Sequence, residues 1–215
     1  MSEYSRKYKC LIFDWDGTLM DSAGLIVRAV CLAAEQVSLP VPDPDNVRHG
    51  IGTSFDAQYK RLFGAESMDS YASFKDSFYS MYNQEVPKLY PGVEQLLSDL
   101  QDQGYYLAIA TSGSRRMLKD MFSEYNVAQY FALTCTADEF NAKPDPEMLR
   151  YIMSVLKVDE SQTLMIGDSV NDVFAAKNAG VDCLGVTGGV GSGDDLLGAG
   201  AFDVVVDIQH ILRKI

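Results

Sequence analysis

The sequence CLIFDWDGT, residues 10–18, places two aspartates directly after a short apolar run. A run this short and this apolar is typical of a strand that is buried on both faces of a parallel sheet. Ligands of such sheets bind outside the carboxyl ends of the strands, which is where Asp14 and Asp16 fall. Because residues two apart point the same way in an extended chain, we expect the two carboxylates to face one site.

Asp14 and Asp16 have the side chains that two kinds of chemistry need. Paired carboxylates hold hard cations such as Mg²⁺. They can also divide labour, one attacking phosphorus while the other donates and accepts protons. Gly17 lets the backbone turn sharply after them. The alternative is an ordinary acidic turn at the end of a strand, since Asp and Gly are common in turns.

Short apolar runs and helical patterns alternate along most of the remaining chain. The expected strands are Cys10–Phe13, Tyr106–Ala110, Ala132–Thr136, Thr163–Ile166, Cys183–Val186 and Val204–Val206, and the expected helices are Gly92–Gln103, Pro146–Leu156 and Asn171–Asn178. Strands that alternate with helices predict an α/β fold, here a Rossmann-like parallel sheet core flanked by helices.

Residues 21–87 interrupt this alternation, because they form a long stretch without a strong strand pattern. Helices are expected at Leu25–Gln36, Phe55–Phe63 and Tyr71–Tyr82, with a turn at Pro40–Pro44. We therefore expect a small α-helical domain at 21–87, inserted between the two parts of an α/β core at 1–20 and 88–215.

A second acidic motif, GDSVND at residues 167–172, also follows an apolar run. Asp168 is expected to emerge at the same sheet edge as Asp14, with Asp172 one turn further on. These carboxylates would add ligands for a metal that the first pair cannot fully coordinate. A helix N-cap at Asp168 or Ser169 is an interpretation of the same residues that does not compete with metal binding.

Two shorter segments follow other expected strands. Thr111, Ser112 and Gly113 offer a hydroxyl and backbone N–H groups that suit phosphate oxygens, although an ordinary helix N-cap explains them more simply. Lys143 lies in NAKPDPE, where the prolines stiffen the turn and allow the lysine to be aimed at a site. A solvated surface lysine is the alternative.

Together these four segments resemble the motifs of the haloacid dehalogenase superfamily, and of its phosphoglycolate phosphatase-like members in particular. The match consists of DxDGT at 14–18, the hydroxyl of Thr111, Lys143 in KPDP, and GDSxxD at 167–172, in the family's order over essentially the whole chain. The helical insert is similar to the small α-helical cap of the family. The tail VTGGVGSGDDLLGAGAFDVVVD, residues 186–207, is similar to that of phosphoglycolate phosphatase-like members.

The resemblance implies catalytic roles for four residues. Asp14 would form an aspartyl-phosphate intermediate, and Asp16 would protonate the leaving group and later activate water. Thr111 would bond the transferring phosphoryl group. Lys143 would offset the charge shared by Asp14 and the phosphate, and phosphoryl transfer to a carboxylate requires such neutralisation.

The resemblance also implies a Mg²⁺ cofactor. The ion would be held by Asp14, by the carbonyl oxygen of Asp16 and by Asp168. Asp172 would support it, directly or through water.

The insert contains one loop, RHGIG at 48–52, that is a candidate for substrate selection. Its glycines permit a close approach, and Arg48 or His49 suits a substrate carboxylate or a second anionic group. A helix–helix turn with solvated basic residues explains the loop equally well.

The formal net charge of the 215-residue chain is −12, and this limits the classes of molecule that it can bind. A surface this acidic repels nucleic acid and anionic membrane, and no apolar stretch approaches the length of a membrane span. The four cysteines show no CxxC spacing and the first residues contain no apolar leader, so we expect a reduced, cytoplasmic protein. A monomer and a homodimer are both compatible with the sequence.

We therefore predict a Mg²⁺-dependent phosphatase of a small phosphorylated metabolite, with phosphoglycolate as the leading substrate by analogy. A β-phosphoglucomutase-like phosphotransferase is one alternative, although mutase relatives often have an aliphatic residue where this chain has Thr18. A non-catalytic binding protein on the same scaffold is another, but loss of a motif residue would be its signature and none is lost here.

Overall fold

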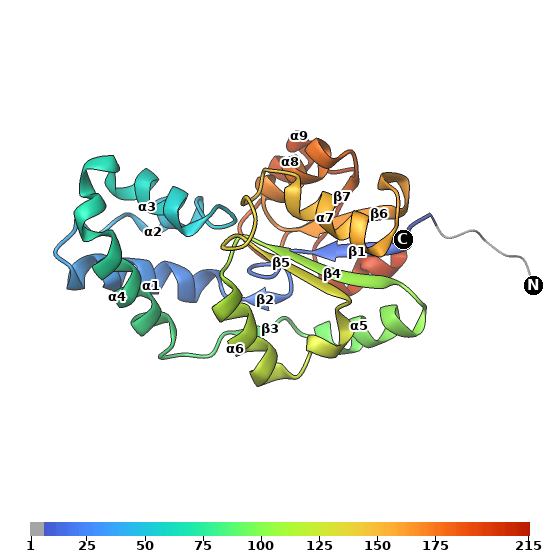
Figure 1. The fold of residues 1–215 in the computed structure, drawn as a ribbon, viewed down its shortest axis with the longest axis horizontal. Coiled ribbons are helices and arrows are strands. Elements are labelled where there is room, and N and C mark those ends of the chain that lie inside the picture. The colour runs from blue at the N-terminus through green and yellow to red at the C-terminus, as the bar shows by residue number, and fades with distance from the viewer. Residues whose placement is uncertain (1–6) are drawn as a thin grey trace, which may run out of the picture.

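Six parallel strands form one sheet in the computed structural model, which describes residues 7–215. Their order across the sheet is β5-β4-β1-β6-β7-β8 (Figure 1). The strands are β1 (Cys10–Phe13), β4 (Tyr106–Thr111), β5 (Leu133–Thr136), β6 (Thr163–Gly167), β7 (Asp182–Val186) and β8 (Asp203–Val205). Each overlaps an apolar run in the sequence, so the predicted α/β fold with a parallel sheet is confirmed.

The strand β1 lies between β4 and β6, and all of its side chains are fully buried. Its register pairs Phe13 with Ile109 of β4 and with Ile166 of β6. Parallel strands in this register end at one edge of the sheet. The residues that follow β1, β4 and β6 therefore come out close together, and Asp14 is the first of them.

Helices cover both faces of this sheet (Figure 1). On one face lie α5 (Val93–Asp102) and α6 (Arg115–Tyr125), and on the other lie α7 (Glu147–Leu156), α8 (Val170–Ala179) and α9 (Gly193–Ala199). In α5, Val93, Leu96, Leu97 and Leu100 recur at helical spacing, and all four are buried against the sheet. The apolar stripe of each helix thus closes one side of the core.

A group of helices lies beside the sheet, between β2 (Met20–Asp21) and β3 (Lys88–Leu89) (Figure 1). These helices are α1 (Ala23–Gln36), α2 (Pro44–Arg48), α3 (Phe55–Phe63) and α4 (Tyr71–Tyr82). They enclose a hydrophobic cluster of their own that is rich in aromatic rings. Because β2 and β3 pair antiparallel, the chain leaves and rejoins the sheet at one place. We propose that this pair bounds an inserted helical domain at 21–87.

Some short elements differ from the expectation. The helix α2 begins at Pro44, inside the segment expected to be a turn, because the Asp43 carboxylate accepts bonds from the N–H groups of Asp45 and Asn46. The last strand ends before Val206, which is 78% exposed. The cysteines are free thiols. Within residues 7–215, no helix has both the length and the apolar character that crossing a membrane requires.

Candidate active site

Three aspartates from distant parts of the chain meet at the carboxyl edge of the sheet. Asp14 follows β1, Asp168 follows β6, and Asp172 lies in the first turn of α8. One carboxylate oxygen from each lies within 4.8 Å of the other two, and all three residues are buried. The fold thus assembles the carboxylates expected to hold a metal. The side chain of Asp16 lies outside this cluster. The metal ligand expected from Asp16 is its backbone carbonyl oxygen, not its carboxylate.

Lys143 lies between two of these carboxylates. Its Nζ is 2.7 Å from Asp14 Oδ1 and 2.6 Å from Asp172 Oδ1, and its side chain is fully buried. Burial disfavours the charged lysine, but the two carboxylates outweigh this effect and hold the pKa of Lys143 above its usual range. The lysine is therefore a fixed positive charge aimed at Asp14, and not a solvated surface residue.

Asp14 has one oxygen in structural contacts and one that is free. Its Oδ1 contacts Lys143 and accepts a 2.7 Å hydrogen bond from the backbone N–H of Trp15. Its Oδ2 has no hydrogen-bond partner within residues 7–215, and Asp14 lines a cavity. Burial raises the pKa of Asp14 well above its usual range, while the charge of Lys143 acts in the opposite direction. The free oxygen is the one available to a substrate.

Asp168 is held by contacts from several sides. Thr18 Oγ1 donates a 2.7 Å bond to its Oδ1, and the N–H of Val190 donates a 2.9 Å bond to its Oδ2. Gly17 and Gly189 approach so closely that a Cβ atom would fall 2.3 Å and 1.9 Å, respectively, from Oδ2. Burial raises the pKa of Asp168 to about 7. A bound cation would favour its ionised form.

The donors in this cluster fit a hard divalent cation. All three are carboxylates, which Mg²⁺ prefers as ligands. Three buried acids face one buried lysine among the residues that the structure describes. Excess charge of one sign is costly in a buried site unless another ion neutralises it. Asp14, Asp168 and Asp172 are therefore the side chains that would hold such a cation.

Gly189 offers a test of how tightly Asp168 must be placed. Gly189→Ala would put a methyl group 1.9 Å from Asp168 Oδ2 and 2.6 Å from the carbonyl oxygen of Gly17, so the carboxylate must move. We expect a loss of about 10- to 100-fold in apparent Mg²⁺ affinity, which is typical when a ligand loses its support. The measurement is a titration of the protein with Mg²⁺ by calorimetry.

The matched control is Gly198→Ala, because a Cβ at Gly198 meets nothing within 4 Å. This change should give the same apparent Mg²⁺ affinity as the wild-type protein. An unaltered Mg²⁺ response in Gly189→Ala would show that the position of Asp168 does not matter for the metal.

Asp172 also belongs to the start of α8. Its Oδ2 accepts a 3.0 Å bond from the N–H of Ser169 and a 2.6 Å bond from Ser169 Oγ. This capping box fixes the aspartate and leaves Oδ1 for Lys143. The helix N-cap and the acidic cluster are thus built from the same residues, as the sequence suggested.

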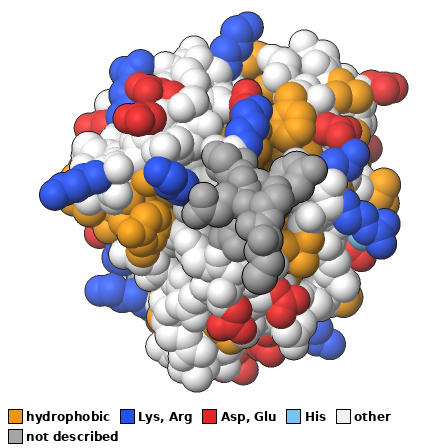
Figure 2. Space-filling view, turned by 90° about the vertical axis from the view of Figure 1, so that its right-hand side faces the viewer, with side chains coloured by type: hydrophobic (Ala, Val, Ile, Leu, Met, Phe, Trp, Pro, Cys, Tyr) orange, Lys and Arg blue, Asp and Glu red, His pale blue; other side chains and the backbone are white. Residues whose placement is uncertain are grey.

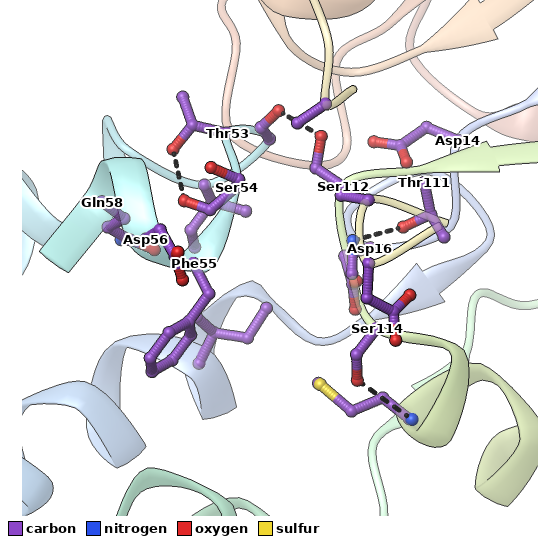
Figure 3. Close-up of a pocket in the computed structure, with 18 of the residues that line it drawn as sticks. Asp14, Asp16, Thr53, Ser54, Phe55, Asp56, Gln58, Thr111, Ser112 and Ser114 are labelled. Atoms are coloured by element: carbon purple, nitrogen blue, oxygen red, sulfur yellow. Dashed lines mark hydrogen bonds between the residues drawn. The ribbon is translucent and has the colours of Figure 1, made fainter. Parts of the chain in front are cut away.

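Asp16 and the loop after β4 lie on the same wall of the cavity as Asp14 (Figure 3). Asp16 Oδ1 accepts a 2.7 Å bond from Ser22 Oγ, and burial raises the pKa of Asp16. A raised pKa favours the protonated form that a general acid needs. Thr111 Oγ1 accepts a 3.0 Å bond from the N–H of Gly113, so the hydroxyl proton of Thr111 is free to be donated.

Ser112 connects this loop to the helical insert. Its Oγ donates a 2.8 Å bond to the carbonyl oxygen of Gly52 (Figure 3). Tyr79 of α4 makes a similar bridge, since its hydroxyl donates to Ser114 Oγ at 3.3 Å. The Ser112 hydroxyl is therefore engaged with the insert, and its backbone N–H remains as the group that can meet a phosphate oxygen.

A cavity of about 440 Å³ separates the edge of the sheet from the insert (Figure 3). The sheet side contributes Asp14, Asp16, Thr111, Ser112 and Gly113, and the insert contributes Ile51, Gly52, Thr53, Ser54, Phe55, Asp56, Gln58, Lys75, Phe78 and Tyr79. A volume of this size is typical of small-molecule sites. The arrangement therefore gives a small ligand access to Asp14 and places it between the edge of the sheet and the insert.

Arg48 and His49 lie outside the lining of this cavity. Arg48 is half-buried at the end of α2, and His49 is exposed, with its Nδ1 2.6 Å from the carbonyl oxygen of Asp45. The loop reaches the cavity through Ile51 and Gly52 instead. A role of the two basic residues in substrate binding stays a prediction that this placement does not favour.

Some lining residues were not selected from the sequence, among them Ser54, Lys75 and Tyr79. Lys75 and Tyr79 are four residues apart on α4 and so share one face of the helix. That spacing is visible in the sequence. The sequence does not show, however, that this face of α4 meets the edge of the sheet.

Comparisons with known proteins give matches over most of the chain. Residues 11–186 match the family model described as haloacid dehalogenase-like hydrolase. The chain is 31% identical to a phosphoglycolate phosphatase of Vibrio cholerae serotype O1, over 98% of each chain. It is 33% identical to the probable phosphatase IndB of Dickeya dadantii, over 95% of each. A crystal structure of a predicted phosphoglycolate phosphatase from Haemophilus somnus superimposes with a TM-score of 0.88 at 26% identity, covering 98% of this chain and 99% of that one.

Proposed function

The chain belongs to the haloacid dehalogenase-like hydrolase family and is a phosphoric monoester hydrolase, and we propose that it transfers phosphate from a small metabolite to Asp14 and then to water. The observation that carries this proposal is the environment of Asp14, which has a free oxygen in the cavity and a buried lysine 2.7 Å from its other oxygen. A carboxylate can attack an anionic phosphate only where the repulsion between them is cancelled. We infer that Lys143 cancels part of it.

In the first step, Oδ2 of Asp14 attacks phosphorus, and the bond from phosphorus to the ester oxygen breaks. Asp16 gives its proton to that departing oxygen, and its raised pKa suits this role. The hydroxyl of Thr111 and the N–H of Ser112 hold oxygens of the transferring group. Lys143 compensates the charge that Asp14 and the phosphoryl group share.

In the second step, water attacks phosphorus and the bond from phosphorus to Asp14 breaks, which releases inorganic phosphate. Asp16, now ionised, takes a proton from the water and returns to its starting state. Mg²⁺, when bound by Asp14, Asp168 and Asp172 and the carbonyl oxygen of Asp16, would neutralise charge on the phosphoryl oxygens.

We propose phosphoglycolate, or a phosphate monoester similar to it, as the substrate, and the cytoplasm as the compartment. Support comes from relatives named phosphoglycolate phosphatase that match nearly the whole chain. A solved structure named putative beta-phosphoglucomutase from Bacteroides vulgatus is only 19% identical and so indicates a shared fold alone. No observation favours a mutase, and Thr18, which donates to Asp168, is the residue that mutases often replace.

The test is a screen of small phosphate monoesters with Mg²⁺, ranked by kcat/KM. We expect release of inorganic phosphate, with 2-phosphoglycolate among the best substrates. Conversion of a sugar phosphate to its isomer without phosphate release would contradict hydrolysis and favour phosphate transfer.

A further inference from the structure

The wall of the cavity that the insert contributes contains one cation. Lys75 is the only Lys, Arg or His among the described residues that line the cavity, and the acidic lining residues are Asp14, Asp16, Asp56 and Asp138. Within residues 7–215, no carboxylate lies within ion-pair distance of the Lys75 ammonium, and no hydrogen bond joins it. Its Nζ lies 5.8 Å from the centre of the Phe55 ring and 5.6 Å from that of Tyr71.

The other polar side chains of this wall are already engaged. Each has a hydrogen-bond partner in the insert or in the facing loop, and they are Thr53, Ser54, Asp56, Gln58 and Tyr79. Asp56, the acidic side chain that the insert contributes to the lining, accepts from the Tyr71 hydroxyl. The half-buried Lys75 is therefore the one polar group of the wall whose charged end contacts only aromatic rings. Such rings attract a cation, but more weakly than an anion does.

We propose that Lys75 binds a second anionic group of the substrate, on the side of the cavity opposite Asp14. The substrate class is a phosphate monoester whose leaving group carries a carboxylate or a further phosphate. This inference rests on the proposed function, because it places the transferred phosphate at Asp14. Lys75 then supplies the positive charge that an otherwise acidic cavity lacks at its far wall.

The dimensions and surroundings of the cavity agree with such a substrate. A cavity of about 440 Å³ is large enough for a whole small ligand, and its lining includes both Asp14 and Lys75. Phe55 and Phe78 line the same wall, and the Phe55 ring places apolar surface beside the lysine. Charge pairs are stronger where water is excluded. The position therefore favours an anion over a neutral hydroxyl group.

The test compares each anionic ester with a neutral partner of similar length. One pair is 2-phosphoglycolate and ethyl phosphate, a second is 3-phosphoglycerate and glycerol 3-phosphate, and a third is fructose 1,6-bisphosphate and fructose 6-phosphate. For Lys75→Gln, we expect the ratio of kcat/KM within at least one pair to fall by about 10- to 100-fold. The pair that responds identifies the carboxylate or the second phosphate.

Two further variants complete the experiment. Lys60→Gln, on α3 and exposed, removes an equal charge outside the cavity and should leave all ratios unchanged. Lys75→Arg keeps the charge and should retain most of the selectivity. Unchanged ratios in Lys75→Gln for every pair, or an equal fall in Lys60→Gln, would overturn the proposal.

A binding measurement separates this inference from the proposed function. In Asp14→Asn protein, calorimetry should show a Kd for the preferred anionic ester that rises about 10- to 100-fold when Lys75→Gln is added. If Kd rises in this way but the wild type releases no phosphate, the proposed hydrolysis is refuted and the anion site at Lys75 is supported. If the wild type releases phosphate but Kd does not depend on Lys75, the anion site is refuted and the proposed hydrolysis is supported.

Discussion

Asp14→Asn is expected to lower phosphatase turnover by about 10⁴-fold or more while the protein remains folded. The amide has nearly the same shape as the carboxylate, but it has no charged oxygen with which to attack phosphorus. Losses of this size are typical when a catalytic nucleophile is removed. The measurement is kcat with 2-phosphoglycolate and with p-nitrophenyl phosphate, together with circular dichroism to confirm the fold.

The matched control is Asp120→Asn on α6, which removes one negative charge at an exposed position that does not line the cavity. This variant should keep wild-type turnover. Normal phosphate release by Asp14→Asn would remove Asp14 from the role of nucleophile. A loss of secondary structure in that variant would instead mean that the fold, and not the chemistry, depends on the carboxylate.

Removal of divalent metal is expected to have the second largest effect. The cluster consists of three buried acids, Asp14, Asp168 and Asp172, and one lysine contacts it. A bound anionic substrate would therefore add to an excess of negative charge. We expect EDTA to lower kcat/KM by about 100-fold or more, since losing one preorganised electrostatic contact already costs about that much. Added Mg²⁺ should restore the activity.

The same metal should also stabilise the fold. A cation that binds only the folded protein raises its unfolding free energy by about 2.7 kcal/mol at one hundred times Kd. Thermal unfolding with and without Mg²⁺ measures this, and Asp168→Asn should weaken the response. Full activity in EDTA, with a melting temperature that does not depend on Mg²⁺, would contradict the metal site.

The sheet and the catalytic wall of the cavity could be predicted because both depend on short local patterns. The run CLIF is apolar throughout because both faces of β1 are covered, and this marks the strand without knowledge of its neighbours. Asp14 and Asp168 follow such runs, and parallel strands in register bring their ends together. Lys143 could be selected as a candidate because prolines stiffen its loop, and in the fold its Nζ contacts the Asp14 carboxylate.

The insert was predicted as helical, with its loop at 48–52 as the candidate for substrate selection, but the face of α4 that lines the cavity was not predicted. The amphipathic pattern of α4 shows which residues share a face, but the same pattern fits packing within the insert. A binding role for Lys75 can be inferred only from the folded structure, in which α4 is docked near the loop of Ser112. One of the tertiary contacts there is the bond from Tyr79 to Ser114. Basic residues in a glycine-rich loop, here Arg48 and His49, gave a stronger sequence signal but lie outside the cavity.

The most direct measurement of the central claim is a search for the covalent intermediate on Asp14. Wild-type protein with Mg²⁺ and 2-phosphoglycolate would be quenched in acid at millisecond times, digested, and analysed by mass spectrometry. We predict one added phosphoryl group on the peptide that contains Asp14, which forms within the first turnover and is absent from Asp14→Asn. Rapid turnover without any phosphorylated peptide, or with the phosphoryl group on another residue, would contradict the account.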